Sequence, residues 1–190
     1  MKNSKKVIWI TRTGLFLAIA LLAQIIGAYI QAAPLNQIFT GVLVNMALII
    51  SAVLVGRSSG VIIGIMTPVV ALMLGIMAIP PAAPVIIAGN VVIVLLASTG
   101  FKIAYNNKSV KKYIIIVLTI IISSVVKFAV LYGSVKLVLP LVISNEKQIA
   151  KLGVALGVMQ LFTAVGGGIL SAAILPALRR ARTADEQHNH

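Results

Sequence analysis

Six polar side chains interrupt the long apolar runs of this 190-residue chain and are its best candidates for chemistry. They are amides, hydroxyls and one amine: Asn45, Asn90, Lys127, Tyr132, Gln160 and Thr163. Such groups donate and accept hydrogen bonds, and together they could bind a small polar molecule. Because a polar group in hydrocarbon is costly without a hydrogen bond, each needs either a protein partner or a ligand.

The residue types that usually carry out catalysis are nearly absent from this sequence. The only acids are Glu146, Asp185 and Glu186, there is no cysteine, and both histidines, His188 and His190, lie in the last three residues. Paired-carboxylate catalysis, acidic metal cages and thiolate sites are therefore excluded from the apolar runs. No P-loop, G-x-S-x-G or H-E-x-x-H motif is present. We expect no enzymatic activity, no metal and no cofactor.

The composition is that of an integral membrane protein. The chain is 60% apolar and 10% charged, with a mean hydropathy of +1.10, whereas soluble domains are about half apolar and a quarter charged. A bilayer core of about 30 Å needs about 20 helical residues. Apolar runs of that length lie at 8–30, 37–56, 60–78, 84–103, 113–138 and 152–178.

These runs predict an all-α membrane protein, a six-transmembrane-helix bundle. The bundle would form one substrate-binding domain over residues 1–182, followed by a short polar cytoplasmic tail at 183–190. A cleaved secretory signal is the alternative for the first run, but that run is too long for one.

Basic residues fall mainly on one side of such a bundle. Twelve share the side of the termini, against Lys147 and Lys151 on the other: Lys2, Lys5, Lys6, Arg12, Arg57, Lys102, Lys108, Lys111, Lys112, Arg179, Arg180 and Arg182. Basic residues mark the cytoplasmic side of membrane proteins, so both termini are predicted to be cytoplasmic. The net charge of +13 could instead suggest nucleic acid, but orientation explains it better, and we expect no nucleic-acid partner.

Residues 79–90 (IPPAAPVIIAGN) hold three of the seven prolines and predict a capped mouth on the outer side, with Asn90 just beneath it. Counting about 1.5 Å per residue along each helix puts polar side chains of five helices at similar heights, Gln24 and Gln31 included. We therefore expect a polar pocket that opens outward. The alternative for each amide is a hydrogen bond between helices. Lys127 could snorkel, pair with carbonyls and amides, or meet an anionic ligand.

Small residues predict where helices approach closely. The motifs are Gly60-x-x-x-Gly64, Gly153-x-x-x-Gly157 and Gly166-Gly167-Gly168. We expect internal packing at most of them, although one such face could dock another membrane protein.

Several features together resemble the substrate-binding S components of energy-coupling factor (ECF) transporters. They are the opening segment 11–20 (TRTGLFLAIA), the length, six helices with both ends inside, the proline-rich third loop and Gly89-Asn90. The resemblance implies the membrane-embedded, substrate-specific subunit of an ATP-driven vitamin importer in the bacterial cell membrane. It also implies partners, an energy-coupling transmembrane subunit and two ABC ATPase subunits, and a subunit that topples in the membrane to deliver its ligand.

The family places an Ala-x-x-x-Ala motif of the first helix against the coupling subunit. Here the inner part of that helix has Gly14-x-x-x-Ala18, while Ala28-x-x-x-Ala32 falls at its outer end. The docking role is therefore assigned to Gly14 and Ala18. The alternatives to an S component are a stand-alone carrier or channel that does not depend on ATPase subunits, and a membrane scaffold. The sequence does not name the vitamin.

Overall fold

The structure, a computed structural model, describes residues 2–30, 32, 34–107 and 110–188, and these residues form helices and the turns that connect them, without a strand. Gln31, Lys108 and His190 lie outside the described residues. The helices are α1 (Lys2–Tyr29), α2 (Leu35–Leu54), α3 (Arg57–Met73), α4 (Ala83–Tyr105), α5 (Val110–Leu137), α6 (Glu146–Ala155) and α7 (Val158–His188), with 3-10 turns η1 (Pro80–Ala82) and η2 (Leu139–Leu141).

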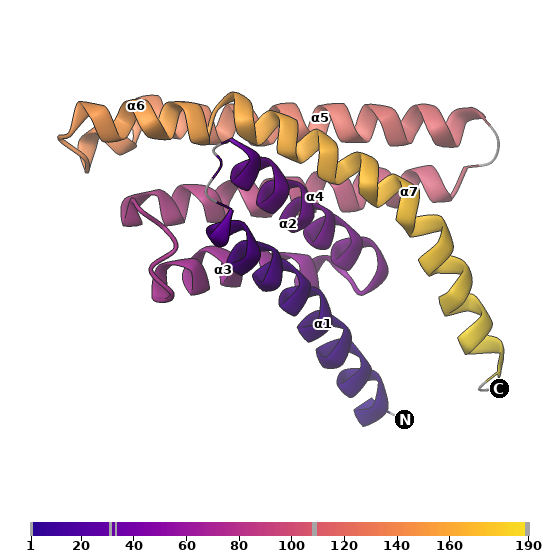
Figure 1. Cartoon of the computed structure of the whole chain (residues 1–190). Coiled ribbons are helices and arrows are strands. Elements are labelled where there is room, and N and C mark those ends of the chain that lie inside the picture. The colour runs from indigo at the N-terminus through magenta and orange to yellow at the C-terminus, as the bar shows by residue number, and fades with distance from the viewer. Residues whose placement is uncertain (1, 31, 33, 108–109, 189–190) are drawn as a thin grey trace.

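The helices form a bundle with two distinct ends. Figure 1 shows both termini and the α4–α5 connection on the right, which we call the terminal end. The α3–α4 and α5–α6 connections lie on the left, and we call this the cavity end (Figure 1). The first half of α1 and the last part of α7 extend away from the other helices at the terminal end (Figure 1).

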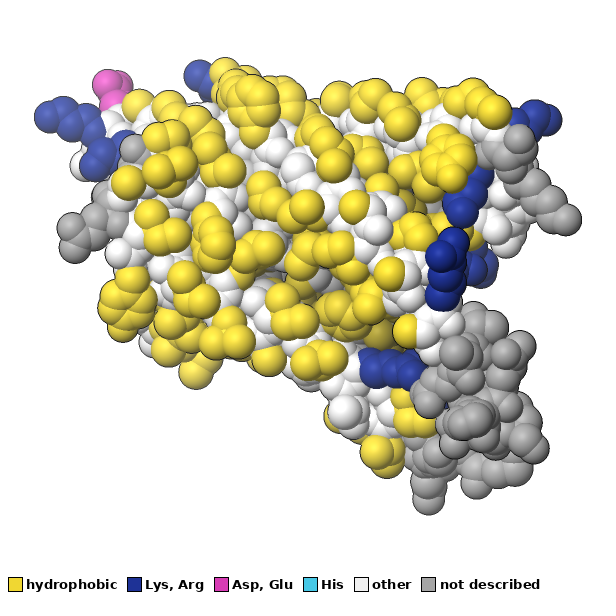
Figure 2. Space-filling model, turned by 45° about the vertical axis from the view of Figure 1, so that its right-hand side comes forward, with side chains coloured by type: hydrophobic (Ala, Val, Ile, Leu, Met, Phe, Trp, Pro, Cys, Tyr) yellow, Lys and Arg dark blue, Asp and Glu magenta, His cyan; other side chains and the backbone are white. Residues whose placement is uncertain are grey.

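Five helical segments are long and apolar enough to cross a membrane: Lys5–Tyr29, Leu35–Leu54, Pro80–Tyr105, Val110–Leu141 and Glu146–Arg182. The shorter α3 is apolar as well. Figure 2 shows hydrophobic side chains spread over the middle of the molecule and lysines and arginines near its two ends. The prediction of a helical, multi-pass membrane protein is confirmed.

Two of the predicted runs have the wrong limits. The third, expected over 60–78, is helical only to Met73, because Gly75 adopts a left-handed φ of 67° that ends the helix. The sixth, expected over 152–178, is divided into α6 and α7. The side chain of Asn145 starts α6 early, since it accepts hydrogen bonds from the backbone N–H groups of residues 147 and 148. At its other end α7 continues as helix past residue 178 to His188.

Glycines set the distances between the main helices. A Cβ on Gly167 would lie 2.6 Å from the Cβ of Asn45 in α2, and one on Gly168 would lie 2.9 Å from Ile120 Cγ2 in α5. A Cβ on Gly60 in α3 would lie 2.8 Å from the Cβ of Ala52 in α2. The prediction of close packing is confirmed at Gly60-x-x-x-Gly64 and at Gly166-Gly167-Gly168 but not at Gly153, where a Cβ would meet no atom within 4 Å. The contacts of Gly167 and Gly168 bring α2, α5 and α7 near enough for polar side chains to meet between them.

Candidate functional site

Lys127 lies in the middle of α5 and is only 2% exposed. Its Nζ donates hydrogen bonds to Asn45 Oδ1 at 2.7 Å and to Asn90 Oδ1 at 3.0 Å. The three side chains come from α5, α2 and α4, so the bonds join three helices in the interior. We call Asn45, Asn90 and Lys127 the amine cluster. Its amides take the place of a carboxylate partner for the lysine.

The NH₂ group of the Asn90 side chain donates to a backbone carbonyl of α3 that lacks its usual helical donor. A proline has no N–H, so Pro68 leaves the carbonyl of Gly64, four residues earlier, without its helical donor. Asn90 Nδ2 donates to that carbonyl oxygen at 3.1 Å. The approach is close because Gly64 has no side chain, and a Cβ there would lie 3.1 Å from the Cβ of Asn90. Asn90 is thus bonded to both α3 and α5.

Asn45 connects the amine cluster to α7. Its Nδ2 donates to the Gly41 carbonyl at 2.8 Å and to Thr163 Oγ1 at 3.5 Å. Thr163 in turn donates to the carbonyl of Gln160 at 3.2 Å. Gly41 makes room for this contact, since a Cβ there would lie 2.7 Å from the Cβ of Thr163.

A cavity of about 1210 Å³ lies at the cavity end, above these residues. Its walls come from the parts of α1 and α2 nearest the cavity end, the α3–α4 connection, and the α6–α7 junction. Its polar lining includes Gln24, Thr40, Lys151, Gln160 and Thr163, and Gly41 lies among them. Most other lining side chains are apolar, among them Ile76, Met77, Ile79, Ile86, Leu152, Leu156 and Met159. Apolar walls with a few polar groups are typical of small-molecule sites.

The amine cluster lies beneath the floor of this cavity. Gly41 and Thr163 line the cavity, and both accept hydrogen bonds from Asn45, one helical turn below Gly41. Asn45, Asn90 and Lys127 are themselves buried, with exposed fractions of 1–3%, and they are not among the lining residues. The structure therefore brings five of the six predicted residues together in two tiers, Gln160 and Thr163 above and the amine cluster below.

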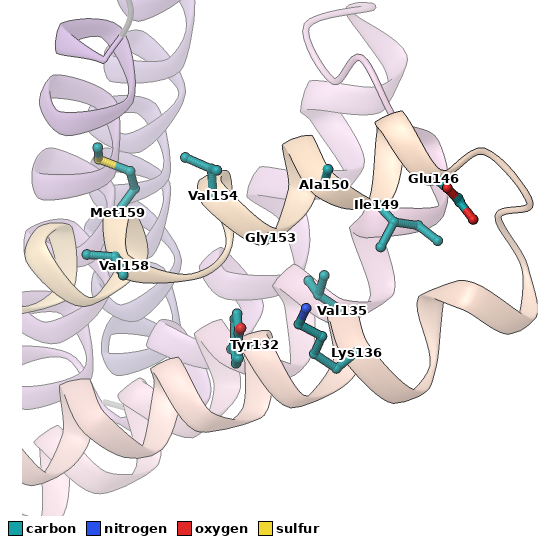
Figure 3. Close-up of a pocket in the computed structure, with 10 residues that line it drawn as sticks. All are labelled: Tyr132, Val135, Lys136, Glu146, Ile149, Ala150, Gly153, Val154, Val158 and Met159. Atoms are coloured by element: carbon teal, nitrogen blue, oxygen red, sulfur yellow. The ribbon is translucent and has the colours of Figure 1, made fainter.

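Tyr132, the sixth, is placed elsewhere. It lines a separate groove of about 550 Å³ between the end of α5 and α6 (Figure 3). Its ring stacks on Phe128, with centroids 5.5 Å apart, and Lys136 Nζ lies 5.6 Å from the ring centroid. Val154 and Met159 line both the groove and the cavity, so the α6–α7 junction is the wall between them. Tyr132 is on the far side of that wall.

Most of the lining residues were not among the six predicted ones, and two of these, Gln24 and Lys151, carry polar groups that a ligand could contact. Gln24 of α1 has a buried Oε1 that accepts no hydrogen bond from any described residue. Lys151 of α6 is the only charged residue among those that line the cavity. The sequence held a signal for Gln24, an amide in the outer half of an apolar run. It held none for Lys151, because a lysine in a polar loop is unremarkable before the fold is known.

The proposed docking residues lie far from the cavity on α1. Gly14 and Ala18 are both exposed, four residues apart on one face. A Cβ on Gly14 would meet no atom within 4 Å. Nothing within the described chain covers this face.

Comparison with known protein families agrees with the geometry. A family model described as ECF transporter, substrate-specific component, matches residues 9–179. No curated protein and no solved structure matched the chain. The match begins in α1 and ends in α7, so it covers the cavity, the amine cluster and most of every membrane-crossing segment. The chain belongs to the family of substrate-specific components of ECF transporters, which are membrane-embedded, substrate-binding transport subunits.

Proposed function

We propose that this chain captures a water-soluble vitamin or vitamin precursor from outside a bacterial cell, as the binding subunit of an ATP-driven ECF importer. The single observation that carries the proposal is the cavity of about 1210 Å³ at the cavity end. Its volume exceeds the roughly 300–1,000 Å³ of most ligand pockets, so a vitamin-sized molecule fits inside it, and its mixture of apolar walls and amide or hydroxyl groups suits a partly polar one.

The upper and lower tiers of residues would have different roles in binding. Gln160 and Thr163 line the cavity and would contact the substrate directly. The amine cluster would act from below by holding Gly41 and Thr163 in place through Asn45. A binding site needs such support, because a floor that shifts weakens every contact made on it. Tyr132 would shape the α6–α7 wall from its outer side, where its ring packs against Gly157.

The orientation follows from charge. Basic residues gather at the terminal end, which would therefore be cytoplasmic, and the cavity would face outside. Lys147 and Lys151, with Glu146, belong to the cavity end. The positive excess at the terminal end far exceeds theirs.

The partners would be an energy-coupling transmembrane subunit and two ABC ATPase subunits. The face of Gly14 and Ala18 offers the coupling subunit a close backbone approach, because small exposed residues let helices pack tightly in lipid.

Purified protein in lipid nanodiscs tests the proposal. Mass spectrometry identifies any small molecule that co-purifies, and calorimetry measures its affinity for the wild type and for Gln160→Ala. A lost hydrogen bond predicts a weakening of about tenfold. Gln148→Ala is the control, since Gln148 is exposed on α6 and lines neither cavity nor groove.

Three outcomes would contradict the proposal in different ways. If Gln160→Ala binds the ligand as tightly as the wild type does, the assignment of the binding site to this cavity is wrong. Uptake by proteoliposomes that lack ATPase subunits would instead favour a stand-alone carrier or channel. The absence of any tightly bound small molecule would favour a scaffold.

A further inference from the structure

The charge in the lining of the cavity is positive. Among the described residues that line the cavity, Lys151 is the only charged one, and none is an aspartate or a glutamate. The whole chain has only three acids. Two of them, Asp185 and Glu186, belong to the last turns of α7, at the terminal end.

The third acid, Glu146, is also too far along its helix to reach the cavity. It begins α6, whereas the cavity is lined by residues from Lys151 onward. Figure 3 shows Glu146 at one end of α6 and Val154, which lines both spaces, at the other. Its carboxylate is therefore not available as a counter-charge for a ligand in the cavity.

The floor supplies no negative charge either. Beneath it, Lys127 is bonded to the amide oxygens of Asn45 and Asn90 rather than to a carboxylate. A positively charged ligand would have to give up its hydration in the cavity without an ion-pair partner, which is costly in a site within the bilayer. An anionic group would meet the ammonium of Lys151.

Gln24 adds a second requirement. Its Oε1 is buried and lacks a donor among the described residues, and an unsatisfied buried acceptor carries a desolvation penalty. The residue lines the cavity, so rotation of its terminal amide would turn the oxygen toward a ligand bound there. An N–H or O–H group on the ligand would remove the penalty. The hydroxyl of neighbouring Thr40 does not donate to the Gln24 oxygen, because it already donates to the carbonyl of Ala23 at 3.3 Å.

We propose that the cavity selects an anionic substrate, a carboxylate or phosphate held at Lys151 with an N–H or O–H donor held by Gln24, and that it rejects cations. This inference rests on the proposed function, since it names the substrate class of the same site. The anionic group binds near the rim, where α6 begins to cover the cavity, and the donor-bearing part binds against α1.

Matched pairs of compounds that differ in charge test this selection. Nicotinate and nicotinamide, pantothenate and pantothenol, and biotin and its methyl ester are titrated into the full-length protein in nanodiscs, with thiamin as the cation. For any pair that binds, we expect the acid to bind about tenfold more tightly than its neutral counterpart. Lys151→Gln should reduce that ratio to about twofold. Lys147→Gln is the matched control, because Lys147 is exposed on the same helix and does not line the cavity.

Gln24→Leu tests the second contact independently. It should weaken an acid and its neutral counterpart by the same factor and leave their ratio unchanged, while Gln148→Leu should change neither. The co-purifying compound identified by mass spectrometry should be an anion at neutral pH.

The failures are distinguishable from those of the proposed function. Thiamin or another cation as the tightest ligand, or a neutral compound that binds as tightly as its acid in the wild type, would overturn the anion selection and leave the importer subunit intact. If no compound co-purifies and none of the panel binds, the proposed function itself fails, and this inference fails with it.

Discussion

At the scale of single residues, the Asn90 side chain resolves two problems at once. Pro68 deprives the Gly64 carbonyl of a donor, and Lys127 has no carboxylate partner within the bundle. One carboxamide serves both, since its Nδ2 donates to Gly64 and its Oδ1 accepts from Lys127. A side chain with only an acceptor or only a donor could not do this. Asn90 is therefore primarily a structural residue that supports the site from below.

We predict that Asn90→Ala lowers the free energy of unfolding by about 1–3 kcal/mol, the cost of leaving buried partners unsatisfied. Unfolding by SDS, followed by the loss of helical circular dichroism, measures the change. Pro68→Ala in the Asn90→Ala background should recover about 0.5–1.5 kcal/mol beyond its effect in the wild type, because an alanine N–H can bond the Gly64 carbonyl.

Pro176→Ala is the control for this rescue. Pro176 also lies inside a helix, but in α7, away from Gly64. If both alanines restore stability equally in the Asn90→Ala background, the gain comes from helix propensity, and the link between Asn90 and Pro68 is wrong.

At the scale of helices, three consecutive glycines let α7 approach two partners. Gly166 and Gly167 pack against Val42 and Asn45 of α2, and Gly168 packs against Ile120 of α5. The close approach is a condition for the polar contact between Asn45 and Thr163, which crosses the same interface. Helix packing and site geometry therefore depend on the same backbone spacing.

We predict that Gly167→Ala destabilises the protein by about 1–3 kcal/mol, as overpacking does, because its Cβ would press on the backbone and Cβ of α2. Gly133→Ala is the matched control. It is also helical, and its Cβ would meet no atom within 4 Å, so it should leave stability unchanged or raise it by up to about 1 kcal/mol.

The same SDS unfolding experiment measures both variants. Gly167→Ala should also weaken substrate binding, since α2 carries Gly41 and α7 carries Thr163. A Gly167→Ala variant as stable as Gly133→Ala would show that α2 and α7 can move apart at no cost.

At the scale of the whole molecule, the distribution of basic residues predicts its orientation in the membrane. The chain has no cysteine, so a single introduced thiol reports position without interference. We predict that Lys147→Cys reacts with a membrane-impermeant maleimide in intact cells and that Lys111→Cys reacts only after permeabilisation, because Lys111 follows the α4–α5 connection at the terminal end. The reverse pattern would invert the topology and place the cavity inside the cell.

The proposed docking to a coupling subunit also concerns the whole molecule. We predict that Ala18→Leu reduces co-purification with that subunit and leaves substrate affinity unchanged, because a larger side chain keeps the backbones apart. Ala129→Leu is the matched control, an equal enlargement at an exposed position of α5. Equal assembly of both variants with the coupling subunit would move the interface away from the α1 face.

The sequence alone determined the class of molecule and much of its packing. Apolar runs of bilayer length identify a helical membrane protein whatever its tertiary contacts, because the hydrocarbon core admits few other structures for such segments. Two of the three glycine motifs, at 60–64 and 166–168, predicted close approach correctly, whereas Gly153 has no neighbour within 4 Å of its Cβ position. The resemblance carried by residues 11–20 and Gly89-Asn90 predicted the family, and the family match confirmed it.

Only the tertiary structure decided what each polar residue touches. Counting residues along a helix gives the height of a side chain but not the direction in which it points, and so Tyr132 was grouped with residues from which the α6–α7 wall separates it. The same limit concealed the two tiers. Lys127 finds its partners on α2 and α4, which lie 82 and 37 residues earlier in the chain. Lys151 lines the cavity from α6, a separate short helix that ends at Ala155 before α7 begins at Val158, whereas the apolar pattern predicted one continuous helix from residue 152.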